Sequence, residues 1–439
     1  MLDVMWRVLM HALVCSMLLS LSLVDCSECE GAGKIPMSSR DFAKACCTVY
    51  PYTLGKHSGG FFEAGVKSDP HYFYKTKILS SDVIYVATPD LPDFINEHFL
   101  LLPQETRVVL VSGSEDIGAP YELFHPNRSY SGYLHTDLWP RGQKIDMQTF
   151  IADPRLQAWF VQNYDLVGCN HFSCSPLSTR NVRDKALIDK VIPIPIGLDF
   201  HTLSEKVKGI GASVVPSLVC AQRQDLQAVR DSKIFRSFIE RPLKVNAEFG
   251  CVFTSPVRIK TRGEICDLLA HAREQGDKRF IEDKFSDAAR RKLGLADMAR
   301  EIHGLTSGIT SKFTSSASPI AKYLKSGGRE RKLKFWKKVS KCSFAIAPPG
   351  FGMDTHRFWE ILQMHAVPIV IASPLDALYS MYPVVIVKRW SEIFEEGSLE
   401  KYKKGIVAKF GENPFNEHVM RSLTIEHWTN LVHATAHKA

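Results

Sequence analysis

Apolar and polar positions alternate along the chain in blocks that predict strands and helices in turn. Short β-branched runs predict buried strands at 82–87, 107–112 and 191–196. The segment 91–102 and the residues Leu156, Trp159 and Phe160 have the spacing of helices. Strands that alternate with helices are typical of a parallel, doubly wound sheet, so the pattern predicts an α/β fold.

The second half of the chain repeats this pattern after a polar interval. Residues 201–245 are mostly polar and charged, the next strand is predicted at 248–254, and 258–341 is predicted to be mainly helical. A chain of 439 residues is too long for one ordinary domain. We therefore expect two α/β domains, 81–245 and 246–439.

The N-terminus carries the one long apolar run, Val8 to Val24, bracketed by Arg7 and Asp25. About 17 residues is the lower limit for spanning a bilayer. Residues 1–25 therefore predict either a cleaved signal peptide or an uncleaved signal anchor, with a buried core helix as the third alternative. The first two place the protein in the secretory pathway, in the Golgi or ER lumen, secreted or type II membrane-anchored. The membrane is a partner only if the segment is uncleaved.

Cysteine usage fits an oxidising compartment. The chain has eleven cysteines, and several crowd the predicted stem 26–80: Cys26, Cys29, Cys46 and Cys47. Such crowding predicts disulfides, whose connectivity the sequence leaves open. Asn127 begins an N-glycosylation sequon, which is weak support for the same compartment.

Composition narrows the classes of protein. A hydrophobic fraction of 45% and a charged fraction of 23% are close to the average of globular proteins, which argues against wholesale disorder and a multi-span membrane protein. The net charge of +8 permits affinity for phosphates, nucleotides or acidic glycans. It is too small to indicate nucleic acid, which we do not expect as a partner.

The segment 342–373 predicts a strand, a loop, a helix and a second strand. The loop Pro348 to Gly352 follows a short buried strand, and Asp354 or Thr355 is a suitable N-cap for the helix. One buried helical face is predicted from the spacing of Phe358, Ile361, Leu362 and His365. A glycine-containing loop thus points at a helix N-terminus.

That arrangement suits a nucleotide diphosphate. Gly350 and Gly352 let the backbone approach a ligand closely, and the helix N-terminus offers N–H groups to a phosphate. Arg357 in the first turn supplies a cation, and Glu360, three residues later, has the position to accept hydrogen bonds from ribose hydroxyls. The alternative is an ordinary strand-to-helix turn in which Arg357 and Glu360 form a surface ion pair.

The segment resembles the C-terminal, nucleotide-sugar-binding half of exostosin-like glycosyltransferases over about 50 residues, 342–393. The residues that match are Phe344-Ala345-Ile346-Ala347-Pro348-Pro349-Gly350, Asp354-Thr355-His356-Arg357-Phe358-Trp359-Glu360, Val367-Pro368-Ile369-Val370, Ser373-Pro374-Leu375 and Trp390-Ser391-Glu392-Ile393. One position departs from the family pattern, because His365 stands where such proteins usually carry glycine.

The resemblance implies a GT-B-like fold, in which two Rossmann-like domains face each other across a cleft and the second domain holds the donor. The candidate donor contacts are Gly350, Gly352, Asp354, Thr355, Arg357 and Glu360. It also implies a glycosyltransferase that moves a sugar from a nucleotide-diphosphate donor to a hydroxyl of a glycan or glycoprotein acceptor, without a cofactor. The alternative is a catalytically inactive lumenal protein of the same fold that binds carbohydrate or nucleotide sugar. His365 is the main support for that alternative.

Transfer needs a base for the acceptor hydroxyl and positive charge for the departing diphosphate. The sequence has no Asp-x-Asp motif, so we expect Arg357 and the helix N-terminus to supply the charge, with no obligatory metal. The base is expected at the strand ends of the first domain. Asp116 is the first candidate, followed by Glu115 and Asp199, and the alternative for each is an ordinary loop carboxylate or helix cap.

The basic stretch 329–341 leaves two interpretations open. A solvated helix face is favoured, with Leu333 and Trp336 turned inward. An acidic acceptor or membrane headgroups are the other candidates for its charge, and Lys338 and Lys341 are possible contacts to the donor phosphates.

Overall fold

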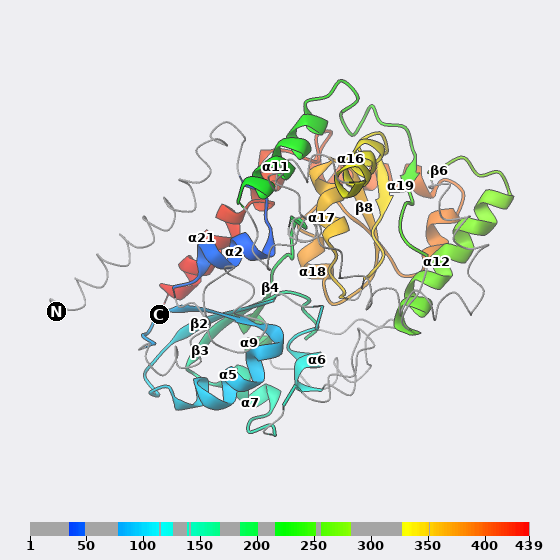
Figure 1. The fold of residues 1–439 in the computed structure, drawn as a ribbon. Helices are drawn as coiled ribbons and strands as arrows, with labels where there is room; N and C mark the ends of the chain where they lie inside the picture. Colours follow the sequence, from blue (N-terminus) through cyan, green and yellow to red (C-terminus); the bar gives the residue numbers. More distant parts are fainter. Residues whose placement is uncertain are drawn as a thin grey trace, which may run out of the picture.

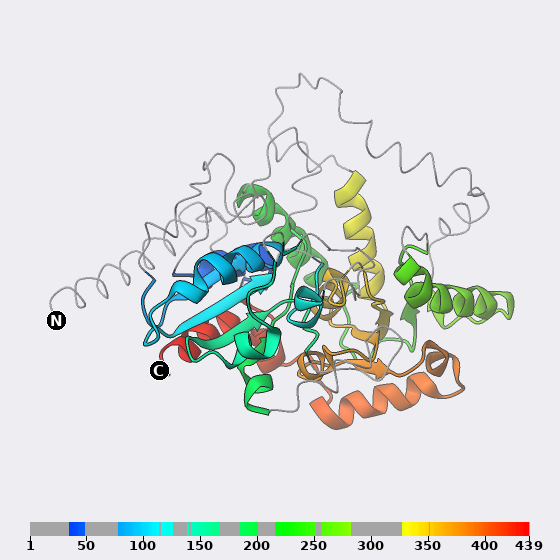
Figure 2. The same ribbon diagram turned by 90° about the horizontal axis from the view of Figure 1, so that it is seen from below.

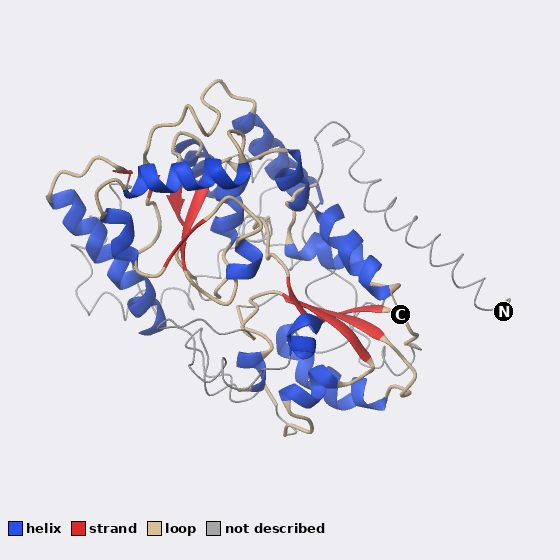
Figure 3. Cartoon of the chain, turned by 180° about the vertical axis from the view of Figure 1, so that it is seen from behind, coloured by secondary structure: helices blue, strands red, loops and turns tan. Residues whose placement is uncertain are grey.

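The computed structural model describes residues 35–48, 78–113, 116–125, 138–139, 142–166, 185–200, 216–251, 256–281, 327–350 and 352–438. They form two lobes, each with its own sheet flanked by helices (Figures 1 and 3). Within these ranges no helix has the length and apolar character to cross a bilayer, and the predicted segment 1–25 lies outside them.

The first lobe contains a four-stranded parallel sheet. Its strands, in spatial and sequence order, are β1 (Val83–Ala87), β2 (Val108–Gly113), β3 (Leu156–Val161) and β4 (Val191–Pro193). The helices between them are η2 (Thr88–Asp90), α5 (Leu91–Glu97), η3 (Phe99–Leu101), α6 (Tyr121–Phe124), α7 (Met147–Ala152) and α9 (Lys185–Lys190). β1 and β2 are wholly buried, as expected of parallel strands covered on both faces.

Both ends of the described chain belong to this lobe. Helix α21 (Ile425–Ala436) contacts β1, β2 and β3, and α2 (Ser39–Cys46) packs on α21. Figure 2 shows the red C-terminal helix against the blue and cyan lobe, although it ends the chain. One face of the first sheet is therefore covered by elements from the two extremes of the sequence.

The second lobe contains a five-stranded parallel sheet. Its spatial order is β6 (Phe280–Ile281), β5 (Val245–Asn246), β7 (Phe344–Ile346), β8 (Val367–Ile371) and β9 (Val385–Val387). Its helices are α11 (Pro216–Arg230), α12 (Pro256–Glu274), α16 (Gly327–Val339), α17 (His356–Gln363), α18 (Asp376–Tyr379), η5 (Trp390–Phe394), α19 (Ser398–Phe410) and α20 (Glu417–Ser422). The predicted α/β class with two parallel-sheet lobes is confirmed.

An extended N-terminal segment joins the first lobe to the C-terminal region. The N–H of Met37 donates to the carbonyl of Leu423 at 2.8 Å, and the N–H of Leu198 donates to the carbonyl of Met37 at 2.7 Å. Gly197 has φ of +67°, and a Cβ there would lie 2.2 Å from the Met37 oxygen. Residues 35–48 of the predicted stem are thus built into the fold, with Met37 itself buried. The prediction of disulfides in the stem is wrong for Cys46 and Cys47, which are free, buried cysteines, and Cys26 and Cys29 lie outside the described residues.

Two sequence-based predictions of secondary structure are wrong. Leu156, Trp159 and Phe160 belong to strand β3 and not to a helix. Ala158 and Val161 are buried as well, so the buried residues of this segment do not follow helical spacing. In the range predicted as a strand, 248–254, residues 248–251 form a loop and 252–254 lie outside the described residues; the strand here is β5, at Val245–Asn246. Cys251, in that loop, forms a disulfide with Cys266. The helix predicted at 91–102 is present in two pieces, α5 and η3.

Candidate functional site

The carboxyl end of the second sheet carries the predicted loop and helix. β7 leads into the loop 347–355, and α17 begins at His356 with its apolar face in the core. A small pocket lies at the ends of β7 and β8. It is lined by Ala347, Pro349, Met353, Val370, Ile371, Ser373 and Tyr379. Ligands of open α/β sheets bind at such strand ends, so the pocket and loop form the candidate site.

The loop contacts the carboxyl edge of the first sheet. The N–H of Asp354 donates to Asn163 Oδ1 at 2.9 Å, and Asn163 follows β3 with φ of +53°. A Cβ on Gly352 would lie 2.7 Å from the same Oδ1. The lack of a side chain at Gly352 therefore leaves room for Asn163 of the other lobe. The sequence predicts that a ligand approaches the backbone at this place.

Asp354, predicted as an N-cap or donor contact, is buried and bonded to the protein. Its carboxylate accepts hydrogen bonds from Ile196 N, Trp359 Nε1 and Tyr379 Oη, each at 2.9 Å. Burial raises the pKa of Asp354 to about 6, and these hydrogen bonds oppose the rise. The side chain joins the loop, the pocket residue Tyr379 and the first lobe.

The N-terminus of α17 has no side-chain cap. Thr355 occupies the N-cap position, but its side chain makes no capping hydrogen bond. His356 Nδ1 lies 2.7 Å from the carbonyl oxygen of Gly197, which is a second contact between the lobes. The first-turn N–H groups therefore lack the hydroxyl or carboxylate that usually satisfies them.

Arg357 lies in this first turn and is half-buried. Its Nη1 is buried and has no hydrogen-bond partner, while the guanidinium carbon is 4.5 Å from the centre of the Phe335 ring. Burial lowers the pKa of Arg357 from its ordinary value, and the negative charges of Glu360 and Glu248 oppose that shift. The side chain is held by packing, with donor capacity to spare.

The neighbouring carboxylates are paired with other cations. Glu360 forms an ion pair with Lys332 at 3.1 Å, and Glu248 pairs with Lys338. The i, i+3 ion pair between Arg357 and Glu360 is therefore not formed. The two acids thus form ion pairs with the two lysines, while Arg357 interacts with them through longer-range attraction.

The basic stretch 329–341 forms α16, and its cations divide into two groups. Arg329 pairs with Asp225 on α11 at 2.6 Å and, like Lys332 and Lys338, points inward. The exposed cations are Arg331, Lys334, Lys337 and Lys341. Trp336 is buried, as the helical spacing predicted, although its Nε1 has no partner.

The candidate bases lie at the carboxyl edge of the first sheet. Asp116 is exposed in the loop after β2, and Asp199 is half-buried after β4, where its backbone carbonyl accepts a hydrogen bond from Lys332 Nζ at 2.6 Å. Glu115 lies outside the described residues. The roles of all three stay predictions. In the described ranges, no group of three or more His, Cys, Asp or Glu side chains has the arrangement of a metal site.

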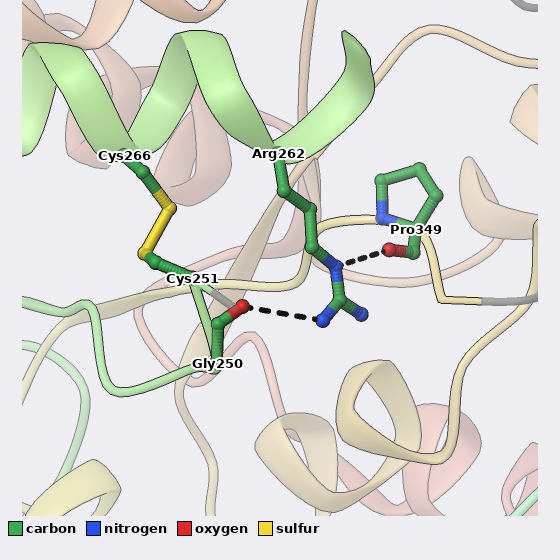
Figure 4. Close-up of a disulfide and its surroundings, with 5 residues drawn as sticks. All are labelled: Gly250, Cys251, Arg262, Cys266 and Pro349. Atoms are coloured by element: carbon green, nitrogen blue, oxygen red, sulfur yellow. Dashed lines mark hydrogen bonds between the residues drawn. A yellow bond between two sulfur atoms is a disulfide. The ribbon is translucent and has the colours of Figure 1, made fainter. Parts of the chain in front are cut away.

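Several residues of the site carry no signal in the sequence. Asn163 and Ile196 reach the loop from the first lobe, and Arg262 reaches it from α12, where its Nε donates to the carbonyl of Pro349 at 2.7 Å (Figure 4). A positive φ at Asn163 is the one local hint, since asparagine tolerates that conformation. The contacts themselves depend on tertiary packing.

His365 lies at the other end of α17 and explains the departure from the family pattern. Its φ is +51°, a conformation that favours glycine after a helix. The ring packs between Phe235, at 4.9 Å, and Phe415, at 5.0 Å. Burial and the nearby positive charges of Arg230 and Arg241 lower its pKa to about 3. This histidine is a packing residue.

No family model matches the chain, and no curated protein matches it. Solved structures give distant likenesses. One is described as trehalose-6-phosphate from E. coli bound with UDP-2-fluoro glucose, with TM-score 0.34, 9% identity, and coverage of 83% of this chain and 74% of that chain. Another is an α,α-trehalose-phosphate synthase (UDP-forming) from Burkholderia vietnamiensis, with TM-score 0.33, 10% identity, and coverage of 84% and 76%. Likenesses this distant carry no argument about function.

Proposed function

We propose that this chain is an exostosin-like glycosyltransferase that moves a sugar from a nucleotide-diphosphate donor to a hydroxyl acceptor. The observation that carries the proposal is Arg357. A buried guanidinium with an unpartnered Nη1 lies in the uncapped first turn of α17, at the carboxyl end of a parallel sheet. Buried polar groups are normally satisfied, and a cation with an unpartnered buried N–H beside a helix start without a side-chain cap is suited to an anion.

The donor would be held by two parts of this site. The pocket at the ends of β7 and β8 has room for little more than a water molecule, so the base and ribose would lie over its mouth, next to Ser373. Arg357 and the first-turn N–H groups would take the diphosphate. Glu360 keeps its proposed part in ribose binding, with Lys332 as its present partner.

Transfer breaks the bond between the sugar and the diphosphate oxygen and forms one to the acceptor oxygen. The acceptor loses its proton to a carboxylate, for which Asp116 is the proposed base because it is exposed at the facing sheet edge. The negative charge that develops on the diphosphate would be stabilised by Arg357, without an obligatory metal.

A secretory location is part of the proposal. The disulfide between Cys251 and Cys266, and the disulfide-bonded state of Cys220, are typical of proteins that fold in an oxidising compartment. The segment 1–25 has the apolar character of a signal peptide or signal anchor. A glycan or glycoprotein acceptor and, for an uncleaved segment, the membrane are the proposed partners.

The test measures nucleotide binding first. Wild type is titrated with UDP, GDP, CDP and ADP, with and without Mg²⁺, and unfolding temperature is recorded. We expect stabilisation by at least one nucleoside diphosphate. In Arg357→Ala, that stabilisation disappears, and turnover with the matching nucleotide sugar falls by about 10²–10³.

Arg421→Ala serves as the matched control, because Arg421 is an exposed arginine outside the candidate site whose guanidinium forms an ion pair with Glu417. It should bind and turn over as wild type does. The absence of stabilisation by every nucleoside diphosphate would reject the transferase. Nucleotide binding without hydrolysis or transfer for any sugar donor would favour the inactive binding protein instead.

A further inference from the structure

Arg262 ties α12 to the loop that opens the candidate site. Its Nε donates to the carbonyl oxygen of Pro349 at 2.7 Å, and its Nη1 donates to that of Gly250 at 3.4 Å (Figure 4). Gly250 belongs to the segment after β5, and Pro349 belongs to the loop after β7. One guanidinium therefore holds two strand-end segments of the second sheet together.

A disulfide fastens the same helix to the same segment. Cys266 lies four residues beyond Arg262, on one face of α12, and is bonded to Cys251. Figure 4 shows both side chains pointing from α12 toward residues 250–251. The direction of Arg262 is thereby fixed by a covalent tie one helical turn away.

The contact to Pro349 acts on the residue that follows it. A peptide unit is planar, so the oxygen of Pro349 and the N–H of Gly350 turn as one body. That N–H donates to the carbonyl of Gly352 at 3.0 Å, which closes the turn before α17. Pro349 also lines the pocket. Arg262 thus orients a peptide that shapes both the loop and the pocket wall.

We propose that Arg262 and the Cys251–Cys266 disulfide form a positioning device for the donor loop, so that donor affinity depends on the oxidised state of this cysteine pair. The inference rests on the proposed function. Reduction by a dithiol adds two electrons and two protons to the pair, giving two thiols, while the dithiol closes to a cyclic disulfide. The helix then loses its covalent tie to residue 251, and Arg262 no longer holds the carbonyl of Pro349 in one direction.

The first experiment measures the dissociation constant of UDP, or of whichever nucleoside diphosphate binds wild type, by calorimetry. Arg262→Gln and the double variant Cys251→Ser/Cys266→Ser should each bind about tenfold more weakly, as when one hydrogen bond from a charged donor is lost. Arg262→Lys should retain part of the affinity. Combining all three substitutions should weaken binding no further than Arg262→Gln does, because they act through one contact.

Two controls isolate this device. Arg273→Gln changes an exposed arginine on the same helix and should leave the dissociation constant unchanged. Dithiothreitol should weaken nucleotide binding to wild type and have no further effect on Cys251→Ser/Cys266→Ser. An equal effect of dithiothreitol on that variant would assign the sensitivity to another disulfide and overturn the proposal.

The second experiment needs no nucleotide. Hydrogen exchange of peptides covering residues 348–355 should be faster in Arg262→Gln and in the cysteine double variant than in wild type. The contrary result is that the variants unfold at lower temperature and keep both the dissociation constant and the hydrogen-exchange rates of wild type. That result would show that the contact and the disulfide serve stability alone, and it would overturn the proposal. If wild type binds no nucleotide, the proposed function fails, and unchanged exchange would separately reject the positioning role.

Discussion

The two ends of helix α17 hold their arginines in opposite ways. At the C-terminal end, Arg230 Nε donates to the carbonyl of Gln363 at 2.9 Å, and Arg241 Nη1 donates to that of His365 at 2.7 Å. At the N-terminal end, Nη1 of Arg357 is buried and has no hydrogen-bond partner among the described residues. The first two cations donate to carbonyl groups at the end of the helix, where a helix leaves such groups unpaired, whereas this nitrogen of Arg357 donates to none of the described groups.

The helix dipole sharpens this difference. The C-terminus of a helix carries partial negative charge, so Arg230 and Arg241 are favourably placed there, while Arg357 opposes the partial positive charge of the N-terminus. A cation that served stability alone would not be expected at that position. The comparison indicates that the C-terminal end is built for the fold and the N-terminal end for an anion.

The largest effect on stability is expected from Arg241→Ala. Besides His365, Arg241 bonds to the carbonyl groups of Cys342, at 3.3 Å, and Arg236, at 2.9 Å. Leaving buried carbonyl groups without donors should lower the free energy of unfolding by about 3 kcal/mol. In urea unfolding, Arg357→Met should lie within about 0.5 kcal/mol of wild type or above it. An equal loss in both variants would break the comparison.

A smaller effect is expected from Asp354→Asn, which probes the contact between the lobes. The substitution keeps the shape of the side chain but replaces one carboxylate oxygen by an NH₂ group. That group faces one of the N–H donors that now bond to Asp354, among them Ile196 N and Trp359 Nε1. We expect the free energy of unfolding to fall by about 2 kcal/mol. Asp376→Asn, at a half-buried position of the same lobe, is a matched control and should cost less than half as much. Asp376 accepts a hydrogen bond from the N–H of Ser373 at 2.8 Å, within its own turn. Equal losses would show that the contact of Asp354 between the lobes stabilises the fold no more than this local hydrogen bond does.

A difference of about 1 kcal/mol is expected between two variants of His365. Both His365→Gly and His365→Ala lose the ring packed between Phe235 and Phe415. Only glycine adopts the φ of +51° without steric cost, so the glycine variant should be the more stable of the two. Equal stabilities in urea unfolding would show that the left-handed conformation relaxes in the variants.

The smallest effect is a pH dependence carried by the same histidine. The folded pKa of His365 is about 3 and its ordinary value is 6.5, so the unfolded chain binds the extra proton first as pH falls. The advantage of wild type over His365→Gly in urea unfolding should therefore shrink between pH 7 and pH 6, by less than about 1 kcal/mol. Asp354, with its pKa raised to about 6, acts in the opposite direction in both proteins and cancels from the difference.

The sequence predicts the parts of this fold that depend on local pattern. The strands at 83–87 and 108–113, and the strand, loop and helix unit that includes Arg357, follow from β-branched runs, turn residues and helical spacing. Trp159 was assigned to the wrong element because, in a strand buried on both faces, every position is apolar and a helical spacing arises by chance.

The use of each site residue was harder to predict than its place. The sequence predicts that Gly352 and Asp354 contact the donor. In the structure, Asn163 of the other lobe packs against Gly352, and the N–H of Ile196 donates to the Asp354 carboxylate. These contacts join residues about 160 to 190 positions apart in the sequence. Tertiary packing alone decides which groups meet there. Arg357 is different, because its place in the first turn of a helix follows from local spacing, although the missing N-cap hydrogen bond does not.

The extended segment that contains Met37 also limits how far the first lobe can lie from whatever holds the N-terminus. Nine residues lie between Asp25 and Ile35, where the described chain begins. The ten steps from one Cα to the next reach about 36 Å at most when fully extended. If the apolar run is held in a bilayer, Ile35 stays within that radius of the lipid, and the lobe that contains it must lie beside the membrane.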